Sequence, residues 1–550
     1  MLTLVDKEAI RQPGQGVRPQ RCGLFVEAYL LLSAAGMLCT PGLTFLGREA
    51  GAFRNLQTGL APLLFVLLAI TGGLRQPLEG IIVRRRPIVL FAAAATAWLL
   101  AQQLSQYLAF YTNATDFSIF DWMLYNTNHG RFMYSPIYGL NHLGVHQTWI
   151  LLAFVPLHRL FESHYLLLLA GAIVAAGGML PLWRLARHFT NNNCIAALLC
   201  AGYITSPWVA QLVDGGFRPE VFFPVVGLTL VWGWLTEQPR IWIPALLLFV
   251  AIKEDAPTYA GGLAFSALVF EPRRRGAALF IIGLCALVFF LDLAVARPIF
   301  LQSTGSAEPG YVQHWGRYGA STGEIIRNVA LSPLQVARDV LTSQWYRLFA
   351  PVLLLPLLSK RAFVAMLPIF VVFGTSANLR SYAGYTIAAM LPFFFWGWLE
   401  TLSRISKLRM APALSLFTLL LFPLVGGAYV HIERPAFEAL AAWPEVVGRI
   451  QNLKGPVCAQ LCIFPHLPYS LDARELAPGC VEGPDAVGVM NARFDPFPFD
   501  DNKLRQVIAD AMKSGGERLR GEFVLVRWTM DLRQRGRTRV AGMMVERHND

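Results

Sequence analysis

Long apolar runs recur along most of the chain, and short clusters of charged residues separate them. The run GAALFIIGLCALVFFLDLAVA, from Gly276 to Ala296, is typical of these segments. About 20 apolar residues in a helix span the hydrocarbon core of a bilayer, because each residue adds about 1.5 Å along the helix axis. The pattern therefore predicts an all-α polytopic membrane bundle.

The Lys and Arg clusters predict on which side of the membrane each connection lies, since cytoplasmic loops hold an excess of these residues. Arg11, Arg18 and Arg21 place the N-terminus in the cytoplasm, and the later clusters alternate as expected for a multi-pass protein of a bacterial inner membrane. About 13 spans follow from this alternation. They are Leu24 to Phe45, Thr58 to Leu74, Ile88 to Tyr111, Tyr165 to Trp183, Ile195 to Leu212, Val221 to Leu235, Ile241 to Ile252, Pro257 to Phe270, Ala277 to Ala296, Tyr346 to Leu358, Ala362 to Phe373, Tyr385 to Leu399 and Leu414 to Val430.

Three segments are predicted to lie outside the cytoplasm. Two belong to the transmembrane domain, residues 1–430: the loop 112–164 and the insert 301–345. The third is a periplasmic C-terminal domain, residues 431–550, in which strand-like GPVCAQLCIF and GEFVLVRW flank helix-like DNKLRQVIADAMKSG, so a small α/β domain is expected. Oxidation is possible there. The candidate disulfide pairs are Cys458 with Cys480 and Cys462 with Cys480.

Composition agrees with a lipid environment and excludes a single soluble domain. The chain is 55% hydrophobic and only 15% charged, whereas soluble proteins carry about 25% charged residues. Its formal charge of +12 would suit a nucleic-acid partner. The basic residues fall on the predicted cytoplasmic loops, however, so we expect membrane lipids and no nucleic acid as partners.

Two of the predicted spans, Ile241 to Ile252 and Pro257 to Phe270, are too short to cross a bilayer alone. Their turn is Lys253-Glu254-Asp255, three consecutive charges. A solvated turn explains such a run equally well. A turn between two short spans is expected below the membrane surface, however, where Lys253 can pair with a phosphate and the carboxylates can position it or bind a cation.

The loop 112–164 carries the densest set of candidate chemical groups. Asp116 follows the third long span closely, and a carboxylate there can act as a general base or help to bind a divalent cation such as Mg or Mn; it can equally be a helix cap. Asp121 follows five residues later, and we expect it to help bind the substrate. His142 and His146 have the spacing of a zinc pair on a helix, but polar contacts with head groups or a phosphate are the simpler interpretation.

Two further loops on the same predicted side contain an Arg. Arg218 and Glu220 lie in VDGGFRPEVFFP, and Arg380 lies in NLRSY. Arginine suits bidentate recognition of phosphate, but it also anchors helices at the interface. The cytoplasmic loops offer basic clusters without such partners, and the chain has no phosphate-binding GxxxxGK[ST] loop. The chemistry is therefore expected on the external face.

Three motifs together resemble a bacterial and archaeal family of polytopic membrane proteins (DUF2079-type), which is similar to the GT-C glycosyltransferases that use polyprenyl-phosphate sugars. These are TDFSIFDWMLYNTNHGRFMYSPIYGLNHLGVHQTWILLAFVPLHRLF, KED at Lys253, and SYAGYTIAAMLPFFF around Tyr385. The resemblance runs from about Ile88 into the C-terminal domain. It implies that Asp116 is the catalytic base or a metal-linked acid that positions the acceptor. His146, Glu220, Lys253, Glu254, Asp255 and Tyr385 fall on other polar positions of the family pattern, while GFRPE replaces a DFHPE-like run.

Together these observations predict a GT-C-like glycosyltransferase of the external membrane face. The donor would be a polyprenyl-phosphate sugar, and the acceptor a glycan, lipid or protein. Lys253 and either Arg218 or Arg380 would hold the phosphate while Asp116 deprotonates the acceptor. A transporter or flippase is the alternative, because short paired spans also occur where broken helices form a binding site. A non-catalytic assembly or export subunit is a third possibility.

Overall fold

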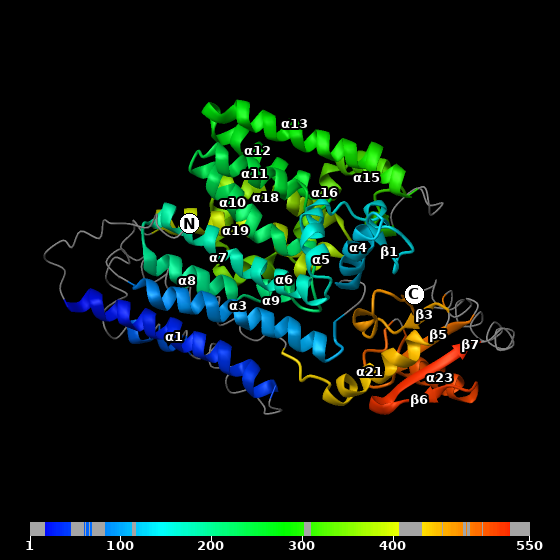
Figure 1. The fold of residues 1–550 in the computed structure, drawn as a ribbon. Helices are drawn as coiled ribbons and strands as arrows, with labels where there is room; N and C mark the ends of the chain where they lie inside the picture. Colours follow the sequence, from blue (N-terminus) through cyan, green and yellow to red (C-terminus); the bar gives the residue numbers. More distant parts are fainter. Residues whose placement is uncertain are drawn as a thin grey trace.

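The structure, a computed structural model, describes residues 17–45, 60, 62–64, 66–68, 83–112, 117–301, 310–405, 432–453, 455–476, 480, 485–497 and 499–528. A helical bundle forms the larger part, and a small sheet domain lies against one end of it (Figure 1). The helices up to the sheet domain are α1 Val17–Phe45, α3 Arg85–Leu108, α4 Ile119–Asn128, α5 Val155–Leu160, α6 Tyr165–Gly177, α7 Met179–Thr190, α8 Asn193–Ile204, α9 Pro207–Leu212, α10 Phe222–Leu235, α11 Pro239–Val250, α12 Ala256–Phe270, α13 Arg275–Leu291, α14 Arg297–Leu301, α15 Thr322–Leu331, α16 Pro333–Thr342, α17 Tyr346–Phe349, α18 Lys360–Thr375 and α19 Leu391–Ile405.

Four helical segments of the described chain are long and apolar enough to cross a membrane, against the 13 spans predicted. Five shorter apolar helices accompany them, among them α11 and α12. Two predicted spans cannot be compared: Leu414 to Val430 and most of Thr58 to Leu74 lie outside the described residues. The four long segments are Gly23–Gly42, Arg85–Leu108, Tyr165–Thr190 and Pro272–Leu301.

Several predicted spans coincide with helices, and others are interrupted. Ile195 to Leu212 is split into α8 and α9, and Tyr385 to Leu399 begins as a 3-10 turn before α19. The short hairpin is present as α11 and α12, which pack side by side. The predicted span Tyr346 to Leu358, in contrast, is α17 followed by two 3-10 turns. Leu353 and Leu354 have positive φ angles of 54° and 60° there, which no right-handed helix can contain. Local apolar content did not reveal this break.

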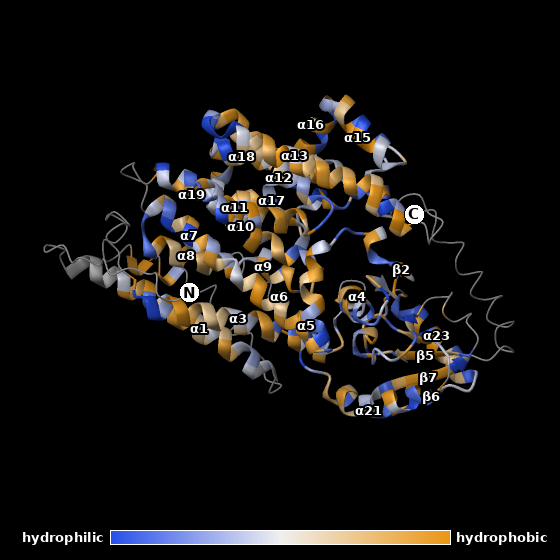
Figure 2. Ribbon diagram, turned by 45° about the horizontal axis from the view of Figure 1, so that its top comes forward, coloured by the Kyte–Doolittle hydropathy of each residue, from blue (hydrophilic) through white to orange (hydrophobic). Residues whose placement is uncertain are grey.

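Apolar surface is arranged as a lipid-facing bundle requires. Figure 2 shows apolar residues along the outer helix α13, where Leu279, Phe280, Leu287 and Phe290 are exposed. Inside the bundle, small residues allow close helix contact. A Cβ at Gly227 of α10 would collide with Pro392 of α19, so a larger residue would push these helices apart.

The C-terminal region contains the predicted α/β fold. Its five-stranded sheet has the order β4-β3-β5-β7-β6, with β3 parallel to β4 and β5, and β7 antiparallel to β5 and β6. The predicted helix and the strand GEFVLVRW are confirmed, while GPVCAQLCIF forms only a short strand. The elements are α21 Phe437–Gln451, β3 Val457–Ala459, β4 Ala473–Glu475, β5 Ala486–Asn491, α23 Asp501–Lys513, β6 Glu517–Arg518 and β7 Phe523–Trp528. Cys458 pairs with Cys480, and Cys462 is a buried free thiol.

Helix α4 links the bundle to this sheet domain (Figure 1). The side chains of Phe117, Phe120 and Leu124 are buried in the bundle. Trp122, on another face of α4, belongs with Phe110 to the apolar core of the C-terminal domain. After α4 the chain forms a small hairpin, β1 Tyr134–Ser135 with β2 Leu140–Asn141, and then the 3-10 turn η4, His142–Gly144.

Candidate functional site

The turn between α11 and α12 gathers most of the charged residues predicted from the sequence. Lys253 Nζ lies 2.7 Å from Oε1 of Glu220. Glu220 belongs to the 3-10 turn η6, Pro219–Val221, which leads directly into α10. Because α10 packs on α11, the start of one helix meets the end of the other, and the two charges are brought together.

Glu254 is held by the first loop. Its Oε1 lies 2.9 Å from Nδ1 of His146, and its Oε2 accepts a hydrogen bond of 3.2 Å from the backbone N–H of Gln147. Burial alone would raise the pKa of Glu254, but His146 and Lys253 hold this pKa well below its ordinary value. Glu254 is therefore a fixed carboxylate that joins the 112–164 loop to the hairpin turn.

Asp255 differs from its two neighbours. Its Oδ2 accepts a hydrogen bond of 2.7 Å from the Tyr259 hydroxyl, while its buried Oδ1 has no hydrogen-bond partner within the described part of the chain. Burial raises the pKa of Asp255 to about 6; Lys253 opposes this shift and Glu254 adds to it. A carboxyl group poised in this way can accept a proton or a hydrogen bond from a bound molecule.

Arg218 and Tyr385 complete this group, called here the Lys253 cluster: His146, Arg218, Glu220, Lys253, Glu254, Asp255 and Tyr385. The guanidinium carbon of Arg218 lies 4.2 Å from the centroid of the Tyr385 ring, and Arg218 also donates to the carbonyl oxygen of Asp214. Burial would lower the pKa of Lys253, but Glu220, Asp255 and Glu254 raise it well above its ordinary value, and Tyr385 adds a smaller effect.

The predicted catalytic residue, Asp116, lies outside the described residues, so its position is not compared with the cluster. The chain on either side of it is described. Thr112 and Phe117 both approach Gly216, where a Cβ would lie 3.0 Å from Cγ2 of Thr112 and 2.7 Å from Cβ of Phe117. Gly216 has a φ of 121°, so glycine is required there for both conformation and space.

His142 is buried beside the cluster. Its ring centroid lies 5.9 Å from that of His146, and neither ring nitrogen has a hydrogen-bond partner among the residues described. Burial lowers the pKa of His142 to about 3, so the ring is neutral. No three His, Cys, Asp or Glu side chains are placed to hold a metal ion in the described ranges, so the zinc-pair interpretation gains no third ligand.

Sequence reasoning missed a buried ion pair, Asp292 with Arg297. Arg297 Nη2 lies 3.2 Å from Asp292 Oδ2, and both side chains are buried within the apolar segment Pro272–Leu301. Asp292 begins a π-helical turn, a feature often found at functional sites. Helix α14 then packs on η4, which carries His142. Two charges five residues apart in an apolar run were the available signal, but the predicted span ended at Ala296.

Asp121 lies in a second group, called here the Asp121 cluster. Its Oδ2 lies 2.6 Å from Nδ1 of His164 and accepts a hydrogen bond of 2.8 Å from the Tyr469 hydroxyl, and His158 Nε2 lies 3.9 Å from Oδ1. Asp121 is fully buried. Because Tyr469 belongs to the C-terminal domain, this carboxylate connects that domain to the bundle.

Arg380 contacts a third region. Its side chain donates a hydrogen bond of 3.0 Å to Oγ1 of Thr342, and its carbonyl oxygen accepts one of 2.8 Å from the Gln344 N–H. Among the described residues it makes no hydrogen bond or ion pair with the Lys253 cluster. Arg218, in contrast, stacks on Tyr385, a residue that affects the pKa of Lys253.

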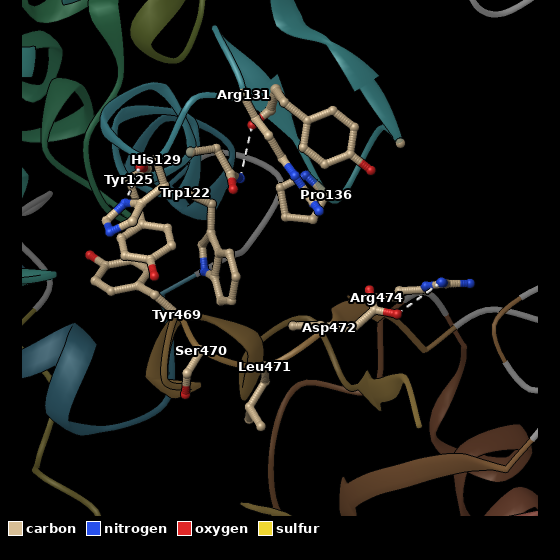
Figure 3. Close-up of a pocket in the computed structure, with 14 residues that line it drawn as sticks. Trp122, Tyr125, His129, Arg131, Pro136, Tyr469, Ser470, Leu471, Asp472 and Arg474 are labelled. Carbon is tan, nitrogen blue, oxygen red and sulfur yellow. Dashed lines mark hydrogen bonds and ion pairs between the residues drawn. The ribbon is translucent and has the colours of Figure 1, made fainter. Parts of the chain in front are cut away.

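A cavity of about 930 Å³ lies between α4 with its following hairpin and the C-terminal domain (Figure 3). It is next to the Asp121 cluster, since Tyr469 belongs to both. The lining residues are Trp122, Tyr125, Asn126, His129, Arg131, Tyr134, Pro136, Gly139, Tyr469, Ser470, Leu471, Asp472, Ala473 and Arg474.

The apolar bundle, its buried charges and the appended sheet define a membrane protein with several apolar helices and a C-terminal α/β region. The chain belongs to the family described as "Predicted membrane protein (DUF2079)", whose model matches residues 106–455. This match confirms the resemblance to that family, but not the similarity to GT-C glycosyltransferases, and it covers both clusters except for Tyr469. No curated protein matches the chain.

Proposed function

We propose that this protein is a glycosyltransferase of a bacterial inner membrane that uses a polyprenyl-phosphate sugar. In the reaction, the bond between the anomeric carbon and the phosphate oxygen breaks, and a bond from this carbon to an acceptor hydroxyl oxygen forms. The hydroxyl proton passes to a carboxylate, and polyprenyl phosphate leaves. The residues required are fixed cations for the phosphate and a carboxylate for the proton.

The Lys253 cluster is the observation that carries this proposal. Lys253 is oriented by Glu220 and retains two further N–H donors for a phosphate, and Arg218 lies in the same cluster. Such cations gain most from the charge that develops on the leaving phosphate, because the site is largely shielded from water. The apolar helices around the turn offer a surface for the polyprenyl chain.

Two carboxylates are candidates to accept the proton of the acceptor hydroxyl. Asp116 remains the proposed base, and Asp255 is a second candidate because its Oδ1 has no partner among the described residues. The Cys458 and Cys480 disulfide supports an external location for the C-terminal domain, since disulfides persist in the periplasm and rarely in the bacterial cytoplasm. The N-terminus would then be cytoplasmic, as the basic clusters predict.

Transport of a lipid-linked or small polar substrate is the second candidate. The observation that favours it is the pair α11 and α12, of 12 and 15 residues, which meet at a charged turn. Discontinuous helices in transporters form substrate sites in this way. The π-helical turn at Asp292 adds another interruption in an apolar segment.

Purified protein in nanodiscs tests the two candidates. Polyprenyl phosphates carrying radiolabelled glucose or mannose are the donors, and release of polyprenyl phosphate is the measurement. We expect Lys253→Ala to reduce transfer at least 10²-fold, by analogy with the loss of one group that stabilises developing charge. Lys253→Arg should restore only part of the rate, because its forked group is larger.

Lys360→Ala is the matched control, because Lys360 is exposed at the start of α18 and lies outside the cluster. It should transfer sugar at the normal rate. If liposomes containing the protein moved an intact donor across the bilayer and no sugar–phosphate bond were cleaved with any acceptor, transport would replace the glycosyltransferase proposal.

A further inference from the structure

One face of α4 forms the upper wall of the cavity in Figure 3. Trp122, Tyr125, Asn126 and His129 all line it. Their spacing of i, i+3, i+4 and i+7 places them on one side of a helix. This side is distinct from the apolar face that carries Phe120 into the bundle. One face of α4 therefore packs within the bundle, and another face lines the cavity.

The C-terminal domain supplies the opposite wall, and aromatic rings join the two. The Tyr469 and Tyr125 rings are stacked with centroids 4.5 Å apart and an angle of 7° between their planes. The His129 ring stacks on Tyr125 at 4.0 Å, and the Trp122 indole meets Tyr469 edge-on at 5.4 Å. Four aromatic rings are therefore packed together on one side of the cavity, and His129 is the exposed member of this group.

The aromatic wall is fixed in place by the Asp121 cluster. The Tyr469 hydroxyl donates to Asp121, whose Oδ2 also contacts His164. Burial and Asp121 raise the pKa of Tyr469, so the phenol stays protonated and the hydrogen bond persists through the physiological range. A wall positioned before a ligand arrives loses less conformational freedom on binding.

Polar groups form the remaining border. Asp472 and Arg474 make an ion pair of 3.0 Å, and the guanidinium carbon of Arg131 lies 5.8 Å from the Tyr134 ring centroid. The cavity thus combines flat rings with a carboxylate, two guanidinium groups and the amide of Asn126. Its charges are nearly balanced, unlike a site for a polyphosphate, and it is too polar for a polyprenyl chain.

We infer that this cavity binds a saccharide, the acceptor of the proposed transfer. Sugar rings present apolar C–H faces that stack on aromatic rings, and hydroxyl groups at their edges that bond to carboxylate, guanidinium and amide groups. The volume of about 930 Å³ is within the range of ligand sites and accommodates a short oligosaccharide. The assignment of this saccharide as the acceptor rests on the proposed function, whereas saccharide binding itself requires no catalysis.

Calorimetric titration of the full-length protein in nanodiscs, without a donor, tests the inference. The probes are maltotriose, tri-N-acetylchitotriose and gentiotriose. We expect saturable binding of at least one of them, and a dissociation constant raised roughly tenfold or more by Tyr125→Ala, which removes the central ring of the stack. Phe497→Ala is the matched control, because Phe497 is an exposed aromatic residue of the same domain outside the cavity, and it should bind normally.

Tyr469→Phe tests the Tyr469 ring separately from the hydrogen bond that its hydroxyl donates to Asp121. It keeps the aromatic surface but removes the bond to Asp121, so it should weaken binding less than Tyr125→Ala does. Absence of binding by all three saccharides at about 10 mM, or equal binding by wild type and Tyr125→Ala, would overturn the inference. Displacement of a bound saccharide by a Gly-Ser-Tyr-rich decapeptide with higher affinity would instead assign the cavity to peptides.

The outcome is independent of the donor assay. Saccharide binding without any release of polyprenyl phosphate would retain the cavity inference and remove the proposed function. Transfer to a lipid or protein acceptor without saccharide binding would do the reverse.

Discussion

The Lys253 cluster and the Asp121 cluster both depend on the 112–164 loop, yet they satisfy buried charge in opposite ways. In the first, cations and carboxylates alternate, and several groups keep hydrogen-bonding capacity for a ligand. In the second, one carboxylate receives short contacts from His164 and Tyr469, one of them on the C-terminal domain. The first arrangement suits binding of a charged molecule, and the second suits the joining of two domains.

The difference shows that a carboxylate of the 112–164 loop is not a catalytic candidate by its position in the sequence alone. Asp116 and Asp121 are five residues apart, and the sequence predicts a catalytic role for the first and substrate binding for the second. The contacts of Asp121 indicate a positioning role, because His164 and Tyr469 share its Oδ2 and it faces the domain junction. A test of Asp116 against Asp121 therefore measures how far the two regions differ in function.

The largest expected effect is that of Asp116→Asn. A general base contributes about 10²- to 10⁴-fold in rate, and the amide keeps the size of the side chain while removing its charge. Transfer from the polyprenyl-phosphate donor should fall by that factor, while melting temperature and saccharide affinity remain normal. Near-normal transfer would demote Asp116 to a helix cap and leave Asp255 as the candidate base.

Much of this architecture follows from short-range sequence pattern, and much of the site does not. The α11–α12 hairpin, α23 and β7 are apparent locally because apolar periodicity and turn residues set them. Lys253 and Glu220 are 33 residues apart in the sequence, and their pairing depends on the packing of two helices, which periodicity alone cannot reveal. The bond from Tyr469 to Asp121 joins residues 348 positions apart and depends on how the sheet domain docks.

The missed pair Asp292 and Arg297 illustrates a different failure. The apolar run around it was recognised, but treating the run as a uniform span hid the cost of a charge within it. Because charged side chains inside a membrane are costly, each one needs a partner and deserves separate consideration. That consideration would have found Arg297 five residues further on.

A smaller effect is expected for Asp121→Asn. The change removes the charge that His164 and Tyr469 bind, and hydrogen bonds to charged groups contribute about 1.5–3 kcal/mol each. The C-terminal domain should therefore be released more readily by limited proteolysis, and saccharide affinity should fall. Donor cleavage at saturating acceptor should change by less than about tenfold, since Asp121 is a positioning residue in this account.

Asp339→Asn is the matched control for that experiment. Asp339 is also buried and also bonded to a tyrosine hydroxyl, that of Tyr318, but its partners lie in the segment 310–345. It should lower overall stability without specific release of the C-terminal domain. Equal release by both variants would show that Asp121 has no special part in docking.

The smallest expected effect is the pH dependence contributed by Asp255. Its ordinary pKa is 3.8, and burial raises this pKa to about 6 in the folded protein. Between these values the folded protein binds a proton that the unfolded chain has released, so folding is penalised progressively as the pH rises through this window.

Asp255→Asn has no such proton, and the stability of the wild type relative to this variant should therefore fall from about pH 4 to about pH 6. The pH-dependent part of this difference, at most about 3 kcal/mol for a pKa raised from 3.8 to about 6, should persist above that window and vanish below it. Melting temperatures in detergent across this range are the measurement, with Asp472→Asn, an exposed acid on the cavity border, as the control that should leave the profile unchanged. Parallel profiles for wild type and Asp255→Asn would mean that Asp255 is ionised throughout this window, and that the Lys253 cluster keeps its carboxylates charged.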